Sequence, residues 1–270
     1  AGFGAIAMLT GVASYYNASL SDHIWSLRRV ELPMEQHLGQ LEASLWKAVH
    51  AVDSVVDASS LAAAEYRQEA DEVQRRAAAY ADLVETDSER AAIGRFRRNV
   101  RALQADAAKV LGLVRQGHRG HEDLLQYADQ ADDVIDVQIT ERFAADPPDT
   151  LAKAKAVREV QVSIWKAMHA AEEYGVWAPS VWHEDTDGQT PADLMAKQFR
   201  DVDEWWARYK KLAGPREQEA IGAFEASWSQ AVAAGRDVVR LHDRMRESYS
   251  ALERRAHVLD GIIDDELRAN

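Results

Sequence analysis

The sequence predicts an all-α fold of two stacked four-helix bundles, formed by six helices, two long and four short, with an internal duplication. Only 14 glycines and 6 prolines interrupt the 270 residues, so long helices with few turns are expected. Two stretches of about 50 residues carry a mainly apolar heptad pattern, as the seam of a helical bundle requires. Three short blocks of sequence also recur in the same order, which indicates that one three-helix unit has been copied.

The composition excludes several classes of protein. The net charge is −13 and the basic residues are interspersed with acidic ones, so no nucleic-acid partner is expected. There is no cysteine, which removes disulfides and thiolate sites for catalysis or metal binding. A glycine-rich phosphate loop, a His-Glu-x-x-His motif and a Gly-x-Ser-x-Gly motif are also absent from the sequence. We therefore predict a protein that is not an enzyme, with no cofactor and no metal site.

The chain starts with an uncharged stretch, AGFGAIAMLTGVASYY at residues 1–16. It is shorter than the roughly 20 apolar residues that span a bilayer, and its two closing tyrosines are typical of a membrane interface. We interpret residues 1–17 as the outer part of a transmembrane helix, so the remainder is expected outside the cytoplasm. A buried N-terminal helix or a signal-peptide remnant is the alternative.

The repeat divides the remainder into two three-helix copies, residues 18–145 and residues 146–270. The block LWKAVHA around Trp46 returns as IWKAMHA around Trp165, 119 residues later. The blocks that begin at Glu89 and at Asp132 return 128 residues later. The difference between 128 and 119 is an insertion in the second copy, and we assign it to the breaker-rich loop at 175–191.

Breakers separate four short helices, expected at residues 20–58, 61–84, 150–174 and 191–212. Candidate N-caps are Ser88, Thr150 and Thr190. The two long helices are each expected to be about 75 Å in length. The seam of the first contains Ile93, Phe96, Val100, Leu103, Ala107, Val110, Val114, Gly117, His121, Leu124, Ala128, Ala131 and Ile135. The seam of the second contains Ile221, Phe224, Trp228, Ala231, Gly235, Val238, His242, Met245, Tyr249, Leu252, Ala256, Leu259 and Ile263.

The expected path lays the two short helices of each copy end to end, with a long helix returning beside both. Four helices then share every level, and both copies contribute to a membrane-proximal and a membrane-distal bundle. The chain begins and ends on the same side, which suits a region between two transmembrane helices.

This organisation resembles the helical bimodular sensor domain of bacterial chemoreceptors and sensor histidine kinases, over residues 20–270. The stretch HAVDSVVDAS at residues 50–59 is also similar to the degenerate Ala-Glu-Lys-x-Phe-Leu-Leu-x-x-Asp segment of helical sensor domains. The resemblance implies a homodimer in the bacterial inner membrane, with this region in the periplasm. It implies binding of a small organic anion, or of a periplasmic binding protein, and a piston or rotation signal through the second membrane helix.

The resemblance also implies arginines that bind the ligand, and Arg28 and Arg29 are the nearest candidates. Their alternative role is that of interfacial cations beside lipid headgroups. Other candidates come from a polar interruption of the long seams at Gly117, His121, His242 and Tyr249.

His121 and Tyr249 occupy equivalent positions of the two copies, so similar heights are expected, near Tyr174 and the loop that carries Trp177. A ligand pocket at this layer would be lined by these side chains. A satisfied polar core layer that specifies helix register is the alternative.

The repeated pairs Trp46/His50 and Trp165/His169 suggest bis-histidine haem or metal ligation as a competing hypothesis. Helical geometry argues against it, because His50 lies about 140° around the helix from the inward-facing Leu45. We expect both pairs on a flank or at a dimer seam.

Three functions remain open. The first is a sensor that binds a small solute and transmits a helix displacement across the membrane. The second is a module that docks a periplasmic protein through the tryptophan-containing loop. The third is a structural helical scaffold without a ligand.

Overall fold

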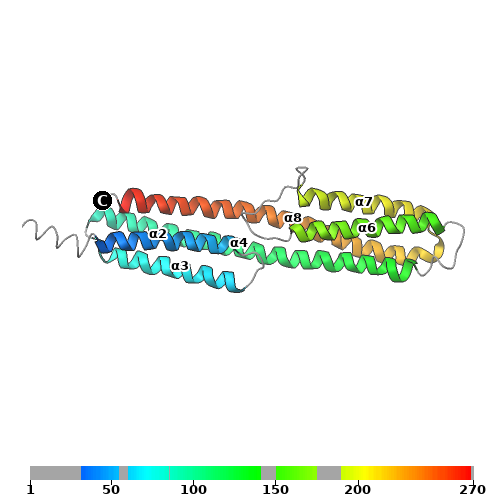
Figure 1. The fold of residues 1–270 in the computed structure, drawn as a ribbon, viewed down its shortest axis with the longest axis horizontal. Helices are drawn as coiled ribbons and strands as arrows, with labels where there is room; N and C mark the ends of the chain where they lie inside the picture. The colour runs from blue at the N-terminus through cyan, green and yellow to red at the C-terminus, as the bar shows by residue number, and fades with distance from the viewer. Residues whose placement is uncertain (1–31, 55–59, 85, 141–149, 175–189, 269–270) are drawn as a thin grey trace, which may run out of the picture. The chain divides into compact units, whose positions relative to one another are not determined.

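The computed structural model describes residues 32–54, 60–84, 86–140, 150–174 and 190–268, and this part of the chain contains helices and no strand. The predicted all-α fold class is therefore confirmed. None of the helices in these ranges is both long and apolar enough to cross a membrane. Six α-helices lie within the described ranges: α2 (Leu32–Asp53), α3 (Ser60–Ala81), α4 (Asp87–Asp133), α6 (Thr150–Tyr174), α7 (Pro191–Leu212) and α8 (Gln218–Gly261) (Figure 1).

Three short helical segments extend the long helices. A π-helix, η2 (Val134–Thr140), follows α4, and a second π-helix, η4 (Ile262–Leu267), follows α8. A 3₁₀ turn, η3 (Pro215–Glu217), precedes α8. The two π-helices begin 128 residues apart, which is the offset of the sequence repeat, so the duplication extends to this uncommon helix geometry.

The described residues form two compact units, and each takes helices from both copies of the repeat. Unit 1 contains most of α2, all but the first turn of α3, the first part of α4, and the end of α8 with η4. Unit 2 contains α6, α7, the remainder of α4 and the first part of α8. Each unit is thus a four-helix bundle, and neither copy forms a globule of its own.

The predicted seams form the cores of the units. On α8 and η4 every seam position is buried, and on α4 and η2 only His121 is less than fully buried. The heptad pattern predicts these positions because a three-four spacing keeps one face of a helix turned toward its neighbours.

The expected path of the chain is wrong in two respects. The short helices of each copy do not follow one another end to end, because α2 and α3 share unit 1 and α6 and α7 pack together in unit 2. The long helices run antiparallel, since Arg95 of α4 donates to Glu266 at 3.0 Å while a Cβ on Gly120 would lie 3.2 Å from Val238. A short hairpin buries the same apolar faces as two helices in line, so the seam pattern fits both paths.

Two capping boxes show how helices begin. Thr190 caps α7 as predicted, accepting a bond from the amide of Asp193 while the Asp193 carboxylate accepts from the Thr190 amide. For α4 the prediction of Ser88 is wrong, because the N-cap is Thr86. Its hydroxyl accepts a hydrogen bond from the amide of Glu89, and the Glu89 carboxylate accepts one from the Thr86 amide.

Candidate functional site

The predicted polar layer lies in unit 2 and contains three histidines. His118 and His121 are on α4, and His242, which is only 6% exposed, is on α8. The space beside Gly120 is occupied by Val238 and by Leu241, the residue before His242. The structure therefore brings His121 and His242 to neighbouring turns of antiparallel helices, as a shared layer requires.

Tyr249 does not belong to this layer. Because the long helices are antiparallel, residues that follow Val238 on α8 lie beside residues that precede Gly120 on α4. Tyr249 is buried, but it lies about 10 Å further along α8 than His242 at 1.5 Å per residue. The expectation that His121 and Tyr249 share one height is wrong for this reason.

His121 packs against the last turns of α6, where it was expected. It interacts with the backbone of Ala171 and with the charge of Glu172, close to Tyr174. The side chain of Tyr174 is not among those described, and Trp177, Arg28 and Arg29 also lie outside the described residues.

Two of these histidines, His121 and His242, have lowered pKa values. Burial lowers the pKa of His121, and the neighbouring His118 lowers it further, against smaller opposing effects from Glu172 and the Ala171 backbone. Burial also lowers the pKa of His242, although Asp243 opposes the shift. The Nε2 atom of His121 has no hydrogen-bond partner within the described ranges, so this atom is available to a polar ligand group. Among those residues no group of three histidine or carboxylate side chains is placed to hold a metal ion.

The outer face of α6 offers a second candidate site in unit 2. It exposes Leu151 (85%), Val162 (38%) and Trp165 (63%), large apolar side chains that proteins usually cover. Beside Trp165 an open groove of about 520 Å³ runs between α6 and α7, lined by Val162, Trp165, Lys166, His169, Ala170, Leu194 and Gln198.

The repeated tryptophans differ in their surroundings. The ring of Trp46 lies 5.0 Å from that of His257, edge to face, and its indole N–H donates to Asp260 at 3.2 Å. By the offset of 128, the position equivalent to His257 is Asp129, so Trp165 has no equivalent aromatic ring at that position. The Trp165 side chain is left largely open to solvent. The associated histidines point outward, as predicted, since His50 is exposed and the His169 side chain is 73% exposed.

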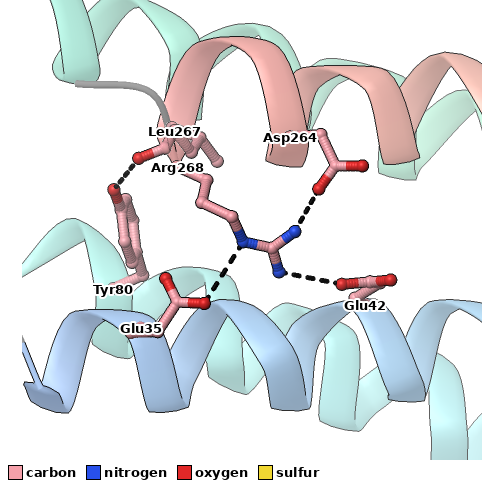
Figure 2. Close-up of polar contacts among 6 residues, drawn as sticks. All are labelled: Glu35, Glu42, Tyr80, Asp264, Leu267 and Arg268. Carbon is pink, nitrogen blue, oxygen red and sulfur yellow. Dashed lines mark hydrogen bonds and ion pairs between the residues drawn. The ribbon is translucent and has the colours of Figure 1, made fainter.

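A third candidate lies in unit 1, where the last described residue joins the first helix (Figure 2). Arg268 pairs through Nε with Glu35 at 3.3 Å, donates through Nη2 to Glu42 at 3.0 Å, and pairs with Asp264. Glu35 and Glu42 belong to α2, so one guanidinium ties the C-terminal segment to this helix.

Tyr80 of α3 supports the same segment from the core. Its side chain is fully buried, and its hydroxyl donates to the carbonyl of Leu267 at 3.1 Å. The amide of Arg268 donates to the carbonyl of Ile263 at 2.8 Å, a π-type bond that continues η4. Sequence reasoning missed this network, because a heptad pattern contains no signal for an ion cluster at a helix end.

Comparisons with known proteins find similar folds among solved structures. No protein-family model matches the chain, and a search of curated proteins finds no match. Among solved structures, the sensor domain of the histidine kinase sensor TorS of V. parahaemolyticus is similar, with a TM-score of 0.57 and 9% identity over 87% of this chain and 95% of that one. The TorS sensor domain in complex with TorT in the presence of TMAO gives a TM-score of 0.53, with 11% identity over 87% and 96% of the two chains.

Proposed function

We propose that this chain is the extracytoplasmic sensing domain of a bacterial transmembrane signalling receptor, and not an enzyme. The observation that carries the proposal is the fold that the chain shares with the TorS sensor domain over 87% of its length. The proposal includes a position in the periplasm between inner-membrane helices, which is supported by the predicted membrane segment at residues 1–17. It also includes a homodimer, which is supported only by the resemblance to helical bimodular sensor domains.

The Arg268 network supports this function. It brings the start of α2 and the end of η4 together in one unit, so segments before and after the domain can leave it from the same end. In the proposed mechanism, binding favours one position of the C-terminal segment relative to α2, and the difference in affinity for the two positions drives the signal. The input is a small solute, most simply an organic anion.

The test joins binding to output. Thermal unfolding of the purified chain is measured against organic acids, amino acids and polyamines, because a solute that binds only the folded state raises the melting temperature. The effective solute is then applied to the intact receptor. A change in output supports the proposal, and a solute that binds the domain without changing the output contradicts it.

A second input is favoured by the exposed face of α6. Trp165 and Leu151 offer the kind of aromatic and aliphatic anchors on which protein interfaces depend, and the similar TorS domain has been solved in complex with TorT. We propose that this face docks a periplasmic binding protein. Trp165→Ala should weaken docking of a purified binding protein at least about tenfold, whereas Val258→Ala, a change at an exposed residue of unit 1, should not.

A further inference from the structure

A small hollow lies between α3 and α4 in unit 1. Its volume is about 260 Å³, and it is lined by Gln74, Ala77, Ala78, Arg97, Val100 and Arg101. Ala77 and Val100 are almost fully buried and make an apolar floor, while Gln74, Arg97 and Arg101 are exposed at the rim. Arg97 and Arg101 are four residues apart and so project from one face of α4.

The duplication identifies the corresponding place in unit 2. The buried positions of α3 match those of α7 at an offset of 129, pairing Tyr66, Ala70, Val73, Ala77 and Tyr80 with Met195, Phe199, Val202, Trp206 and Tyr209. The long helices match at 128, as their π-helices do. Ala77 therefore corresponds to Trp206, and Val100 to Trp228.

In unit 2 two indole rings fill this place. Trp206 and Trp228 are 4% and 5% exposed, and the Trp206 ring stacks on Phe224 with centroids 3.8 Å apart. Their N–H groups donate across the helix pair, from Trp206 to Glu225 at 3.3 Å and from Trp228 to Asp203 at 3.1 Å. Unit 1 has an alanine and a valine instead, which explains why a hollow exists there.

The rim carries positive charge in unit 1, where the corresponding residues in unit 2 are acidic or neutral. Glu225 corresponds to Arg97, Ser229 to Arg101, and Asp203 to Gln74. The segment from 95 to 101, RFRRNVR, holds four arginines and no acid in a chain of net charge −13. Within the described ranges, no ion pair or hydrogen bond occupies the guanidinium groups of Arg97 and Arg101.

We propose that the hollow between α3 and α4 is a binding site for a small organic carboxylate with a compact apolar body. The body takes the space that the two indoles fill in unit 2, over Ala77 and Val100. The carboxylate lies at the rim, where the acceptors Glu225 and Asp203 lie in unit 2. Arg97 and Arg101 donate charge-assisted hydrogen bonds to it, and Gln74 adds an amide donor. The site deepens the proposed sensing function, on which its biological role rests, by naming its ligand class and its place.

Benzoate is the probe that tests the site, and calorimetric titration of the full chain is the measurement. Saturable binding is expected, and Arg97→Glu combined with Arg101→Ser, the residues of the second copy, should weaken it at least about tenfold. Arg236→Glu combined with Arg240→Ser is the matched control, since these arginines of α8 have the same spacing and the same change of charge. Binding in the control should equal that of the unchanged chain.

A second variant tests the space rather than the charge. Ala77→Trp combined with Val100→Trp copies the packing of unit 2 and should abolish benzoate binding in a chain whose circular dichroism is unchanged. If that variant fails to fold, Ala77→Val, which adds only two methyl groups to the floor, should weaken binding severalfold. Acetate, which lacks the body, and benzyl alcohol, which lacks the charge, should both bind at least about tenfold more weakly than benzoate.

Two results would overturn the site. One is a lack of saturable binding of benzoate and of hexanoate up to about 10 mM, where even a millimolar site is filled. The other is binding that survives both the charge and the filling variants. Either result leaves the sensing function standing, because receptor output in response to the wider solute panel tests that function independently.

Discussion

The two units place the same acid at the start of a long helix but surround it differently. Both acids are buried, each 6% exposed. In unit 2 Glu217 accepts hydrogen bonds from Lys153 at 2.9 Å and from the Tyr209 hydroxyl at 2.7 Å. In unit 1 the equivalent Glu89 is bonded by Thr86, through its amide and its hydroxyl.

The partners that Glu89 lacks are used elsewhere or absent. Met34 stands where the second copy has Lys153, and the Tyr80 hydroxyl donates to Leu267 of the C-terminal segment. Unit 2 thus contains a buried ion pair between Lys153 and Glu217. In unit 1 the buried Tyr80 hydroxyl binds the C-terminal segment instead, and the exposed Arg268 of that segment pairs with α2.

Glu217→Gln should have the largest effect. The change removes the counter-charge of Lys153, a buried group, and removing one member of a buried pair costs about 3–5 kcal/mol. Glu89→Gln is the matched control and should cost about 1 kcal/mol, the value of a helix cap. Urea unfolding of both variants measures the difference, and equal losses would contradict the distinction between the units.

The same pair should confer a pH dependence. Burial alone would raise the pKa of Glu217, but hydrogen bonds from Lys153, the Gly214 amide and Tyr209 together lower it below the ordinary value of 4.5. A depressed folded-state pKa adds stability above about pH 4.5, and this stability is lost as the pH falls through the folded value. The acid branch of the stability curve should therefore be shallower in Glu217→Gln than in the unchanged chain.

Gly235→Ala should have the next largest effect, because it tests the tight packing of unit 2. A Cβ there would lie 2.6 Å from the ring of Phe199, which itself packs edge to face on Trp228 at 5.5 Å. Overpacking of this kind costs about 1–3 kcal/mol. Gly222→Ala on the same helix meets nothing within 4 Å and should instead raise the free energy of unfolding by up to about 1 kcal/mol. Chemical denaturation distinguishes the two signs.

Tyr80→Phe should cost about 1 kcal/mol, the net value of one hydrogen bond, and should speed amide exchange in residues 262–268. Burial, together with the negative charges of Glu89 and Glu35, raises the pKa of Tyr80 to about 12. Because the folded value exceeds the ordinary value of 10, stability should be complete below pH 10 and should fall as the pH rises toward 12. In Tyr80→Phe that part of the alkaline loss should disappear, and a curve that keeps it would rule out Tyr80 as its source.

Arg268→Gln should have the smallest effect on global stability, at most about 1 kcal/mol, since exposed ion pairs contribute little. Its expected effect is local: faster hydrogen exchange in η4, with no change in η2, where Thr140 occupies the equivalent position. Equal exchange rates in η4 with and without Arg268 would show that the network does not hold the segment.

Much of the fold could be predicted from the sequence. The seam positions from Ile93 to Ile135 and their copies identified the long helices and their buried faces, because burial imposes the period. Thr190 and Pro191 located the start of α7, because threonine favours the N-cap and proline the first position of a helix. The path of the chain could not be predicted, since hairpins and end-to-end helices bury identical faces.

The candidate site was predicted less well. His121 and His242 were found as polar interruptions of a seam, and the structure brings their turns together. Tyr249 was misplaced, because a repeat gives equivalent positions and carries no information on whether two copies run parallel or antiparallel. The hollow beside Val100 and the Arg268 network depend on which helices become neighbours, and only the three-dimensional structure supplies that.

The mixed make-up of each unit has an evolutionary consequence. Every four-helix bundle borrows a long-helix segment from the other copy, so half of the chain, expressed alone, lacks one wall of its core. Two identical three-helix chains could supply that wall to each other by exchanging their long helices, as domain-swapped homodimers do. The two copies now differ in sequence, and an alanine and a valine in unit 1 stand at the positions of two tryptophans in unit 2.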